Sequence, residues 1–469
     1  MENRSRRVPW SFLGGVILFL LLVASTVLVA PRVEQVIPES GSTDVPSSTS
    51  IQIVFNRDME IDSVETRLSL DPNIPGSFSW EGRTLTFSPE QPWPPGATVT
   101  LHLASGSRSK AVLPIIRSQT WSFRVGETRI LYLWPDGGRA DLYTRSLDGG
   151  ETKRLTDTPF GVLDFSLGPD GRRILYAAMR QDGGSELREL DLSSGKDRLV
   201  YACPQQVRCQ ALAYAADGEV VAFERFGFPR GADGKSLPGP SRVWGLRLSE
   251  NGDAFPIGVA AHVSSIPEWS PTGLLAYYDA TLRAIALVDV ELGPEPTPEN
   301  YIPNDLGLVG SWSPDGSAFI YAAIVFPQTD PDWGDQVVFY SHLYRMDTIT
   351  GRIVDLAEEE VDLVEDAAPS FSPDGAWIAF TRKYLEEHRW TMGRQLWLMR
   401  SDGFGARQLT DDADFHISSL AWSPDSGALA YVRKNQMDIT EPVEIWWIDI
   451  DSREASRLIS GGYSPQWIP

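Results

Sequence analysis

The feature that most constrains the fold is a turn that recurs along the second part of the chain. Residues 313–316 read Ser-Pro-Asp-Gly, residues 372–375 repeat them, and residues 423–426 read Ser-Pro-Asp-Ser, each after an aromatic residue. Proline presets the second turn position, aspartate bonds to the nearby backbone, and glycine tolerates the exit geometry. Degenerate copies stand at 168–171, 216–218 and 270–273. Internal repeats of about 45 to 60 residues built in this way are typical of a β-propeller.

An apolar strand follows each turn, and these strands predict the number of blades. They are expected at 174–178, 220–224, 274–278, 318–322, 377–381 and 428–432, with a further one at 130–134 that no such turn precedes. The first unit therefore lacks an opening strand, and Ser-Pro-Gln-Trp at 464–467 copies the opening of another repeat. We predict four-stranded blades, seven in number with six as the alternative. A C-terminal strand at about 464–468 should close the ring, because closure removes exposed sheet edges.

The repeats resemble the WD40-like repeats of the TolB propeller family over residues 128–469. The resemblance implies the fold and no particular activity, because the same repeat serves binding proteins and the propellers attached to some serine peptidases. Two departures are visible. TolB-type proteins usually have six blades and a small α/β domain in front, whereas this chain counts seven blades and begins differently. The resemblance therefore does not imply a role in the same envelope system.

Residues 33–126 form a separate pattern of short alternating strands between Gly, Pro and Ser turns, as in 51–55 and 99–103. Five to seven antiparallel strands in this length predict a β-sandwich. Pro-Glu-Ser-Gly at 38–41, Leu-Thr-Phe-Ser-Pro at 85–89 and Trp-Ser-Phe at 121–123 resemble the bacterial Ig-like domain of surface-layer (SbsA-type) proteins. The resemblance implies a spacer or adhesion module without chemistry of its own. Apart from the N-terminal helix described next, the predicted fold class is all-β.

The amino terminus decides the compartment. Residues 11–30 carry no charge and are long enough to cross a ~30 Å hydrocarbon core as a transmembrane helix. The basic tail at 1–10 places the amino terminus in the cytoplasm and the following domains outside the cell membrane. A cleaved signal peptide shares this pattern, but Leu28 and Ala30 match its small-residue cleavage positions poorly. We therefore expect an uncleaved, single-pass signal anchor.

Charge and motif content argue against several functions. The 41 Lys and Arg against 63 Asp and Glu give a net charge of −22, and because residues 1–32 carry +3 the remainder carries −25. Such a charge repels a phosphate backbone, so we expect no nucleic-acid partner. The chain contains no G-x-S-x-G, H-E-x-x-H or G-x-x-x-x-G-K-[ST] motif. Its histidines lack metal-ligand spacing, and His342 and His416 are expected to meet an acid or to be structural. We predict no catalytic residues and no enzyme.

One face of the predicted propeller carries the extended loops. Connections between second and third strands lengthen to about 226–241, 325–338, 383–394 and 433–442, and all four lie on the same face. Insertions gathered on one side of a repeat protein commonly form a binding surface. The candidate binding residues on this face are Arg230, Lys235, Trp333, His388, Trp390 and Asn435. Their mixture of aromatic and charged side chains suits contact with a protein or a glycan.

Cysteine and acidic residues leave two further questions open. Cys203 and Cys209 enclose five residues and form either a disulfide or two unrelated thiols. Acidic groups at 358–366 and 411–414 are expected in links between blades near the long-loop face. Hard cations such as calcium prefer oxygen ligands, but most acidic runs are simply solvated. We therefore predict no cofactor, with calcium as the alternative.

The leading hypothesis is a membrane-anchored, extracytoplasmic binding or scaffold protein in which an Ig-like spacer presents a propeller to an unknown protein or polysaccharide. A hydrolase or lyase that acts on glycans with carboxylates of the central channel is an alternative from another class. A structural surface-layer component is a third.

Overall fold

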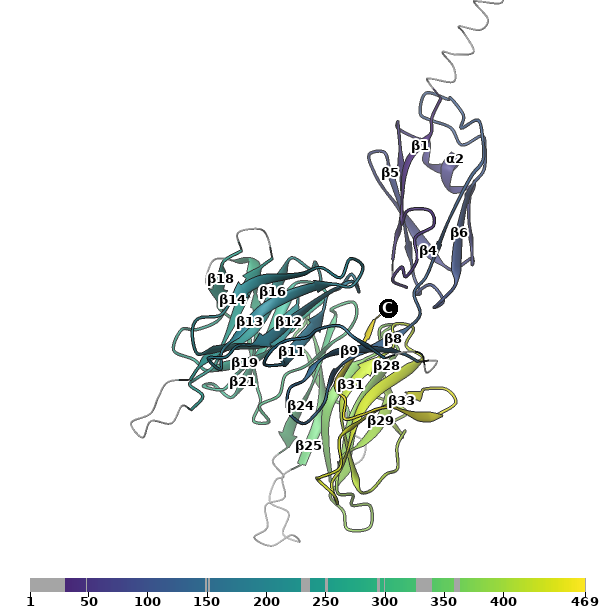
Figure 1. Ribbon diagram of the computed structural model, residues 1–469. Coiled ribbons are helices and arrows are strands. Elements are labelled where there is room, and N and C mark those ends of the chain that lie inside the picture. The colour runs from purple at the N-terminus through teal and green to yellow at the C-terminus, as the bar shows by residue number, and fades with distance from the viewer. Residues whose placement is uncertain are drawn as a thin grey trace, which may run out of the picture. The chain divides into compact units, whose positions relative to one another are not determined.

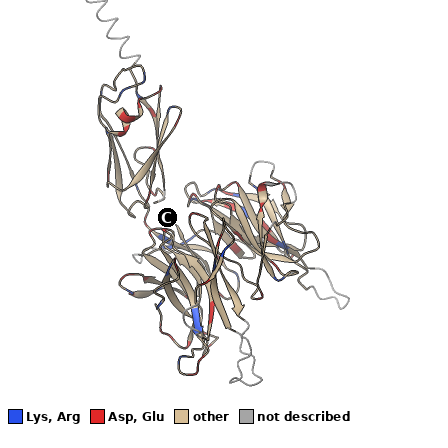
Figure 2. Cartoon of the chain, turned by 180° about the vertical axis from the view of Figure 1, so that it is seen from behind, with Lys and Arg blue, Asp and Glu red and all other residues tan. Residues whose placement is uncertain are grey.

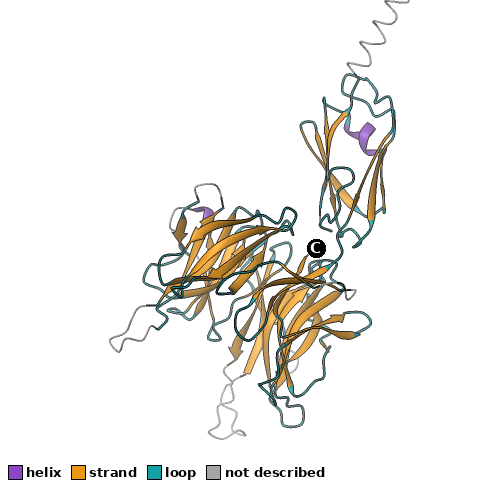
Figure 3. Ribbon diagram, in the orientation of Figure 1, coloured by secondary structure: helices purple, strands orange, loops and turns teal. Residues whose placement is uncertain are grey.

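The computed structural model describes residues 30–468 except 48, 148, 149, 151, 229–236, 249–251, 293–295, 299, 326–339 and 358–362. The chain divides into two compact units, residues 1–127 and 128–469. Strands dominate both units, beside the short α-helix α2 (Ile61–Glu65) and the 3-10 helix η1 (Val290–Leu292) (Figure 3). The predicted anchor at 11–30 lies outside the described residues except for Ala30. Among the described residues, no helix is long and apolar enough to cross a membrane.

The first unit is a β-sandwich of two antiparallel sheets, with strand orders β1–β2–β5–β4 and β3–β6–β7. Its strands are β1 (Val33–Ile37), β2 (Ile51–Phe55), β3 (Leu68–Asp71), β4 (Gly76–Glu81), β5 (Thr84–Pro89), β6 (Thr98–Leu103) and β7 (Gln119–Arg124). Alternate residues of these strands face inward, among them Phe55, Leu85 and Val99, and form one core with the fully buried Trp93, whose ring contacts Phe87 and Phe123. The Nε1–H of Trp93 donates to the Thr49 carbonyl at 2.9 Å. The largest core side chain is therefore buried without an unpaired donor.

The second unit consists of seven antiparallel groups of four strands in the described part of the chain. Blade 1 contains β35 (Tyr463–Ile468), β8 (Arg129–Trp134), β9 (Asp141–Ser146) and β10 (Lys153–Arg154), and blade 2 contains β11 (Val162–Leu167), β12 (Arg173–Met179), β13 (Ser185–Asp191) and β14 (Asp197–Ala202). Blade 3 contains β15 (Val207–Tyr214), β16 (Val220–Gly227), β17 (Arg242–Arg247) and β18 (Ala254–Pro256), and blade 4 contains β19 (Ser264–Trp269), β20 (Leu274–Asp279), β21 (Ala284–Asp289) and β22 (Asn300–Pro303). Blade 5 contains β23 (Gly310–Trp312), β24 (Ala318–Val325), β25 (Tyr340–Asp347) and β26 (Ile353–Asp355), and blade 6 contains β27 (Val364–Phe371), β28 (Trp377–Tyr384), β29 (Gln395–Arg400) and β30 (Arg407–Gln408). Blade 7 contains β31 (Phe415–Trp422), β32 (Ala428–Asn435), β33 (Glu444–Asp449) and β34 (Ala455–Ser460). A single parallel bridge, between Ser341 and Glu365, joins blades 5 and 6.

The last strand of the chain completes the first blade. β35 pairs antiparallel with β8, with Gln466 opposite Leu131 and Ile468 opposite Arg129. Figure 1 shows the yellow C-terminal end of the chain beside β8, where the chain enters this unit. The strand expected at 464–468 is therefore present, and it joins the two ends of the unit so that the first blade has its innermost strand.

Apolar cores between successive blades hold the ring together. The described buried apolar residues form a cluster at each of the interfaces 1–2, 2–3, 3–4, 4–5, 5–6, 6–7 and 7–1. The last interface, in which Ile130 and Trp467 of blade 1 pack against Ala430 of blade 7, closes the ring. This continuous circle of seven interfaces defines the unit as a closed β-propeller.

The repeated tryptophans connect neighbouring blades by hydrogen bonds as well as by packing. The Nε1–H groups of Trp269, Trp312, Trp422 and Trp467 donate to backbone carbonyls on the first strand of the preceding blade. Their distances, 2.9 to 3.2 Å, are those of ordinary hydrogen bonds. The aromatic position before each Ser-Pro-Asp turn is thus structural, as its periodic spacing predicts.

The Ser-Pro-Asp-Gly turns show the local chemistry that their residues predict. In blade 5 the Ser313 hydroxyl donates to Asp315 at 2.6 Å, and Asp315 accepts from the backbone N–H of Ser317. Gly316 has φ +71°, a left-handed conformation that favours glycine. These turns lie on one face of the propeller, because they join first to second strands. Antiparallel order places the second-to-third loops and the links between blades on the opposite face, which we name the long-loop face.

Charge is dispersed over both units. Figure 2 shows Lys and Arg positions interspersed with Asp and Glu positions along the described strands and loops. Many of these charges are paired within a blade, as in the ion pair between Arg173 and Asp170 at 2.7 Å.

Candidate functional site

The long-loop face is the candidate functional site. In blades 6 and 7 its loops cover residues 385–394 and 436–443, because β28 and β32 extend to Tyr384 and Asn435. The two loops thus begin two to three residues later than the predicted 383 and 433. The predicted loop at 226–241 lies partly outside the described residues, and the predicted loop at 325–338 lies largely outside them. Arg230, Lys235 and Trp333 are among the residues left outside.

His388 and Trp390 are presented to solvent on the blade 6 loop. The His388 side chain is 77% exposed, with Nε2 3.4 Å from Glu386 Oε2. Trp390 is 47% exposed, and the Lys383 ammonium lies 4.6 Å from its ring centroid. This exposed aromatic ring beside a cation is available for contact with a partner.

Asn435 serves its own loop instead. Its Nδ2 donates to Glu441 Oε2 at 2.9 Å, and its Oδ1 accepts from the backbone N–H groups of Met437 and Asp438. These bonds use the amide in both directions, so Asn435 shapes the blade 7 loop rather than offering a free amide to a ligand.

The loops of blades 6 and 7 are fixed to one link. The Met392 N–H donates to the Ala413 carbonyl at 2.9 Å, and the Gln436 N–H donates to the Asp414 carbonyl at 2.8 Å. Trp390, Met392, Met437 and Ile439 are 39–75% exposed on these two loops. We name these four side chains the blade 6–7 patch. Exposed apolar side chains grouped on fixed loops are characteristic of interaction surfaces.

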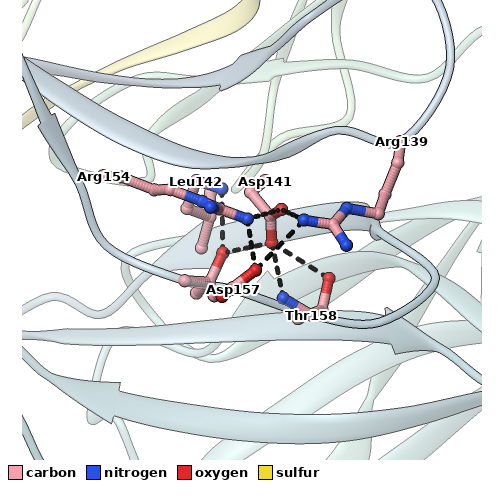
Figure 4. A network of polar contacts seen from close by, with 7 residues as sticks. Arg139, Asp141, Leu142, Arg154, Asp157 and Thr158 are labelled. Carbon is pink, nitrogen blue, oxygen red and sulfur yellow. Dashed lines mark hydrogen bonds and ion pairs between the residues drawn. The ribbon is translucent and has the colours of Figure 1, made fainter.

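A buried carboxylate organises the same face at blades 1 and 2 (Figure 4). Asp141, at the start of β9, has a side chain only 3% exposed. Its Oδ1 accepts from the Thr156 hydroxyl and from the hydroxyl and backbone N–H of Thr158, all at 2.9–3.0 Å. Its Oδ2 lies 2.8 Å from Arg154 Nη2 and 3.7 Å from Arg139 Nη2. Asp141 therefore fixes the link that leads from blade 1 into blade 2.

The environment of Asp141 favours its charged form. Burial raises the pKa of this carboxyl, but the hydrogen bonds from Thr158, Arg154 and Thr156 outweigh burial and leave the pKa below its usual value of 3.8. The same two arginines hold Asp157, whose Oδ1 lies 3.0 Å from Arg139 Nη2 and 2.5 Å from Arg154 Nη2 (Figure 4). Asp157 is thus an exposed carboxylate in a fixed position.

Blade 6 contains the same backbone arrangement with an amide in place of the carboxylate. Gln395 Oε1 accepts from the Thr410 hydroxyl and the Asp412 N–H, and the Leu396 N–H donates to the Thr410 hydroxyl. In blade 1 the Leu142 N–H donates to Thr156 in the same way. A polar residue at the start of the third strand, bonded to the following link, is therefore a structural lock that the propeller uses more than once.

A pocket of about 410 Å³ lies beside the blade 1 lock. Its lining residues come from the link after blade 1 and from the strands and loop of blade 2: Asp157, Thr158, Pro159, Phe160, Tyr176, Ala178, Met179, Arg180, Gln181, Glu186, Arg188 and Asp197. No pattern in the sequence identifies this pocket. Its residues are spread from 157 to 197, and they come together only when the link has folded onto blade 2.

A charged network forms the floor of this pocket. Arg188 bridges two carboxylates, with Nη1 2.9 Å from Glu186 Oε1 and Nε 3.0 Å from Asp197 Oδ1. The Tyr176 hydroxyl donates to Asp197 Oδ2 at 2.5 Å. Burial, together with this bond to a carboxylate, raises the pKa of Tyr176. The tyrosine is therefore a neutral hydrogen-bond donor and not a base at physiological pH.

Carboxylates on and beside the innermost strands are further polar groups, which the sequence indicates only as a class. The Glu268 side chain on β19 keeps contact with solvent, but the protein atoms packed around it displace part of its hydration and raise its pKa to about 7. Burial also raises the pKa of Asp164 on β11 and of Glu224 on β16. The Leu212 N–H donates to Asp164 at 2.8 Å. Of these carboxyls, Glu268 is the one that exchanges protons near neutral pH.

The acidic segments do not form a metal site in the part of the chain that the structure describes, where no group of three or more His, Cys, Asp or Glu residues could hold an ion. Glu365 and Asp366 correct the prediction that the acidic segment 358–366 lies wholly in a link, because both belong to β27. Asp366 is 1% exposed and is held by Arg382 through two bonds of 2.6 and 2.8 Å. It is a buried ion pair and not a solvated loop acid. Residues 358–360 and 362 lie outside the described residues.

His262 and His342 pair with acids, as His388 does, whereas His416 bonds to a backbone N–H. His342 Nδ1 lies 3.0 Å from Asp355 Oδ2, and His262 Nδ1 lies 2.6 Å from Asp279 Oδ2. The His416 ring instead accepts from the Arg394 N–H at 3.2 Å. Burial, together with the charges of Arg394 and Lys383, lowers the pKa of His416. Of the two expected outcomes, His342 thus has the acid partner, and His416 has a structural contact with the backbone.

Cys203 and Cys209 form a disulfide between blades 2 and 3. The loop that it closes supplies two carbonyls to the pocket rim, because Arg180 donates to Cys203 O at 2.6 Å and to Pro204 O at 2.7 Å. The Ser185 hydroxyl donates to the Cys209 carbonyl at 3.1 Å and accepts from the Cys209 N–H. The cysteines pack in the core between blades 2 and 3, and the loop that they close reaches the pocket only through Arg180.

Comparison with known proteins identifies the first unit. A family model described as a bacterial Ig-like domain matches residues 28–125. The first unit is a bacterial Ig-like domain. The fold that follows this Ig-like domain is a β-propeller, similar in structure to TolB from Acinetobacter baumannii, with 13% identity, coverage of 94% of this chain and 99% of that one, and a TM-score of 0.42.

Two curated relatives match parts of the chain. An uncharacterized protein of Agrobacterium fabrum, Atu1656, is 28% identical over 170 residues, which cover 34% of this chain and 50% of that protein. An uncharacterized peptidase of Bacillus subtilis, YuxL, is 34% identical over 84 residues, which cover 18% of this chain and 12% of that protein. The chain thus spans half the length of one relative and a small part of the other.

Proposed function

We propose that the chain is a membrane-anchored, extracytoplasmic binding protein. In this proposal residues 11–30 are a signal anchor, the Ig-like domain is a spacer, and the propeller recognises a protein or a glycan on its long-loop face. The observation that carries the proposal is the blade 6–7 patch, in which exposed apolar side chains stand on two loops fixed to one link. Tryptophan, which Trp390 exposes here, is among the residue types that contribute most of the binding energy at protein interfaces.

Capture from an envelope extract tests the binding role. The full chain should retain a partner that a Trp390→Ala/Ile439→Ser variant loses. Ile349→Ser is a matched control, since Ile349 is 86% exposed but lies between β25 and β26 on the opposite face. Equal capture by all three proteins would contradict a role of the long-loop face.

Protease accessibility tests the proposed topology. In membrane vesicles of known orientation, the propeller should be cleaved only when the extracytoplasmic side faces the protease. Cleavage from the cytoplasmic side would contradict the anchor orientation.

A second candidate function, glycan hydrolysis or elimination, is favoured by Glu268, whose pKa of about 7 suits a general acid or base. Polysaccharides incubated with the full chain would then yield products that Glu268→Gln no longer forms. Binding without product formation favours the binding protein.

A further inference from the structure

The pocket formed by blade 2 and the link before it has the dimensions of a small-ligand site. Its volume of about 410 Å³ falls within the range of about 300–1,000 Å³ that is usual for such sites. It lies on the long-loop face, which is the binding face of the proposed function. The ligand class of this pocket would specify the glycan form of that function.

Phe160 provides the apolar surface of this pocket. Its side chain is 46% exposed, although it is a large aromatic residue. The backbone after it is fixed on both sides, because the Val162 N–H donates to the Ala140 carbonyl at 2.7 Å and the Met179 N–H donates to the Gly161 carbonyl at 2.8 Å. Gly161 has φ +97°, so the chain can reverse directly after the ring. An exposed ring held in place can bury the C–H face of a sugar without first being ordered.

Hydrogen-bond acceptors surround this ring. Asp157 and Glu186 each use one carboxylate oxygen for arginine, Oδ1 and Oε1 respectively. Within the described part of the chain, the other oxygen of each has no protein partner. Charged acceptors form shorter and stronger bonds to hydroxyl groups than neutral ones do. Two fixed carboxylate oxygens beside an aromatic ring therefore suit a ligand with several hydroxyl groups.

The charge of the lining selects against an anion. Three carboxylates, from Asp157, Glu186 and Asp197, stand against two guanidinium groups, so the lining residues carry a net charge of −1. Both guanidinium groups are already engaged, Arg188 by Glu186 and Asp197, and Arg180 by Asp182 and two backbone carbonyls. A uronate or a phosphate would meet unpaired carboxylate oxygens and no free cation of the lining.

We propose that this pocket binds a neutral saccharide, with Phe160 as the stacking surface and Asp157 and Glu186 as acceptors of its hydroxyl groups. The proposal rests on the glycan form of the proposed function. It places the glycan at blades 1 and 2 and leaves the blade 6–7 patch to other contacts.

Calorimetric titration of the full chain tests this assignment. The probes are neutral trisaccharides of glucose, mannose, galactose and N-acetylglucosamine, with trigalacturonate as the anionic counterpart. At least one neutral trisaccharide should bind, and trigalacturonate should bind at least tenfold more weakly. Failure of all four neutral probes, or preference for trigalacturonate, would overturn the proposal. Protein capture by the blade 6–7 patch would then still stand, so the two failures are distinguishable.

Two variants locate the binding. Phe160→Ala should weaken the neutral trisaccharide at least about tenfold, whereas Phe404→Ala should change nothing, since Phe404 is 56% exposed between β29 and β30 on the opposite face. Glu186→Gln keeps an acceptor for Arg188 but removes the negative charge. It should weaken the neutral sugar several-fold, and an unchanged affinity in both Phe160→Ala and Glu186→Gln would place the sugar elsewhere and overturn the proposal.

Discussion

Blades 1 and 6 use the same lock with different chemistry. In both, the residue that begins the third strand accepts from a threonine hydroxyl and from a backbone N–H of the following link. Gln395 meets this structural need with a neutral amide. Asp141 meets it with a buried charge that requires two arginines, and the same arginines hold Asp157 at the pocket. The carboxylate in blade 1 therefore contributes more than propeller stability, because through the two arginines it also positions Asp157, a side chain of the proposed saccharide site.

The largest effect should follow from removing the charged lock. Asp141→Ala leaves two threonines and Arg154 without their buried acceptor, and breaking a buried ion pair costs several kcal/mol. Because Arg154 is 37% exposed and keeps Asp157 as a partner, we expect the lower end, about 3 kcal/mol. Calorimetric unfolding of the full chain measures this loss in the propeller transition, and the Ig-like transition is the internal control. A loss below about 1 kcal/mol would contradict the account.

Removing the neutral lock should cost less. Gln395→Ala deprives the Asp412 N–H and the Thr410 hydroxyl of an acceptor but leaves no charge unpaired. We expect a loss of about 2 kcal/mol in the same calorimetric transition. Equal losses of unfolding free energy in Gln395→Ala and Asp141→Ala would contradict this expectation, because they would mean that pairing with arginine adds nothing to the stability that Asp141 contributes.

The smallest stability effect should depend on pH. Asp141→Asn retains an acceptor for the threonines but loses the charge. Because the pKa of Asp141 is lowered in the folded protein, its ionic contribution is present above its usual value of 3.8 and is lost as pH falls below that value. The wild type should therefore exceed Asp141→Asn by about 1 kcal/mol at pH 7, and the difference should vanish toward pH 2. Urea unfolding at both pH values measures it, and a constant difference would contradict the assignment.

Features that depend on local chemistry could be predicted from the sequence. The Ser-Pro-Asp-Gly turns and the tryptophans before them recur because each blade needs the same reversal and the same bond to its neighbour. Their count also predicts the strand at 464–468. The disulfide remained an open alternative, because a spacing of six residues allows a bridge without requiring one.

The pocket could not be predicted in this way. Phe160 stands in an ordinary link, and Glu186 and Arg188 flank the buried Leu187 as polar residues of a half-buried strand do. Their proximity depends on how the link before blade 2 folds against the strands of that blade, which has no signature within either segment. Asn435 shows the reverse case, since its place in the predicted loop 433–442 made it a binding candidate while its hydrogen bonds serve the loop.

The most direct test of the account is a titration that separates binding from stability. The neutral trisaccharide that the full chain binds most tightly is titrated into Asp141→Asn and Gln395→Ala under identical conditions. Because Asp141 acts on the pocket through Arg139, Arg154 and Asp157, Asp141→Asn should bind several-fold more weakly although it is the more stable variant. Gln395→Ala should bind as the wild type does. Unchanged binding in Asp141→Asn, or equal weakening in both variants, would contradict a lock that positions the binding site.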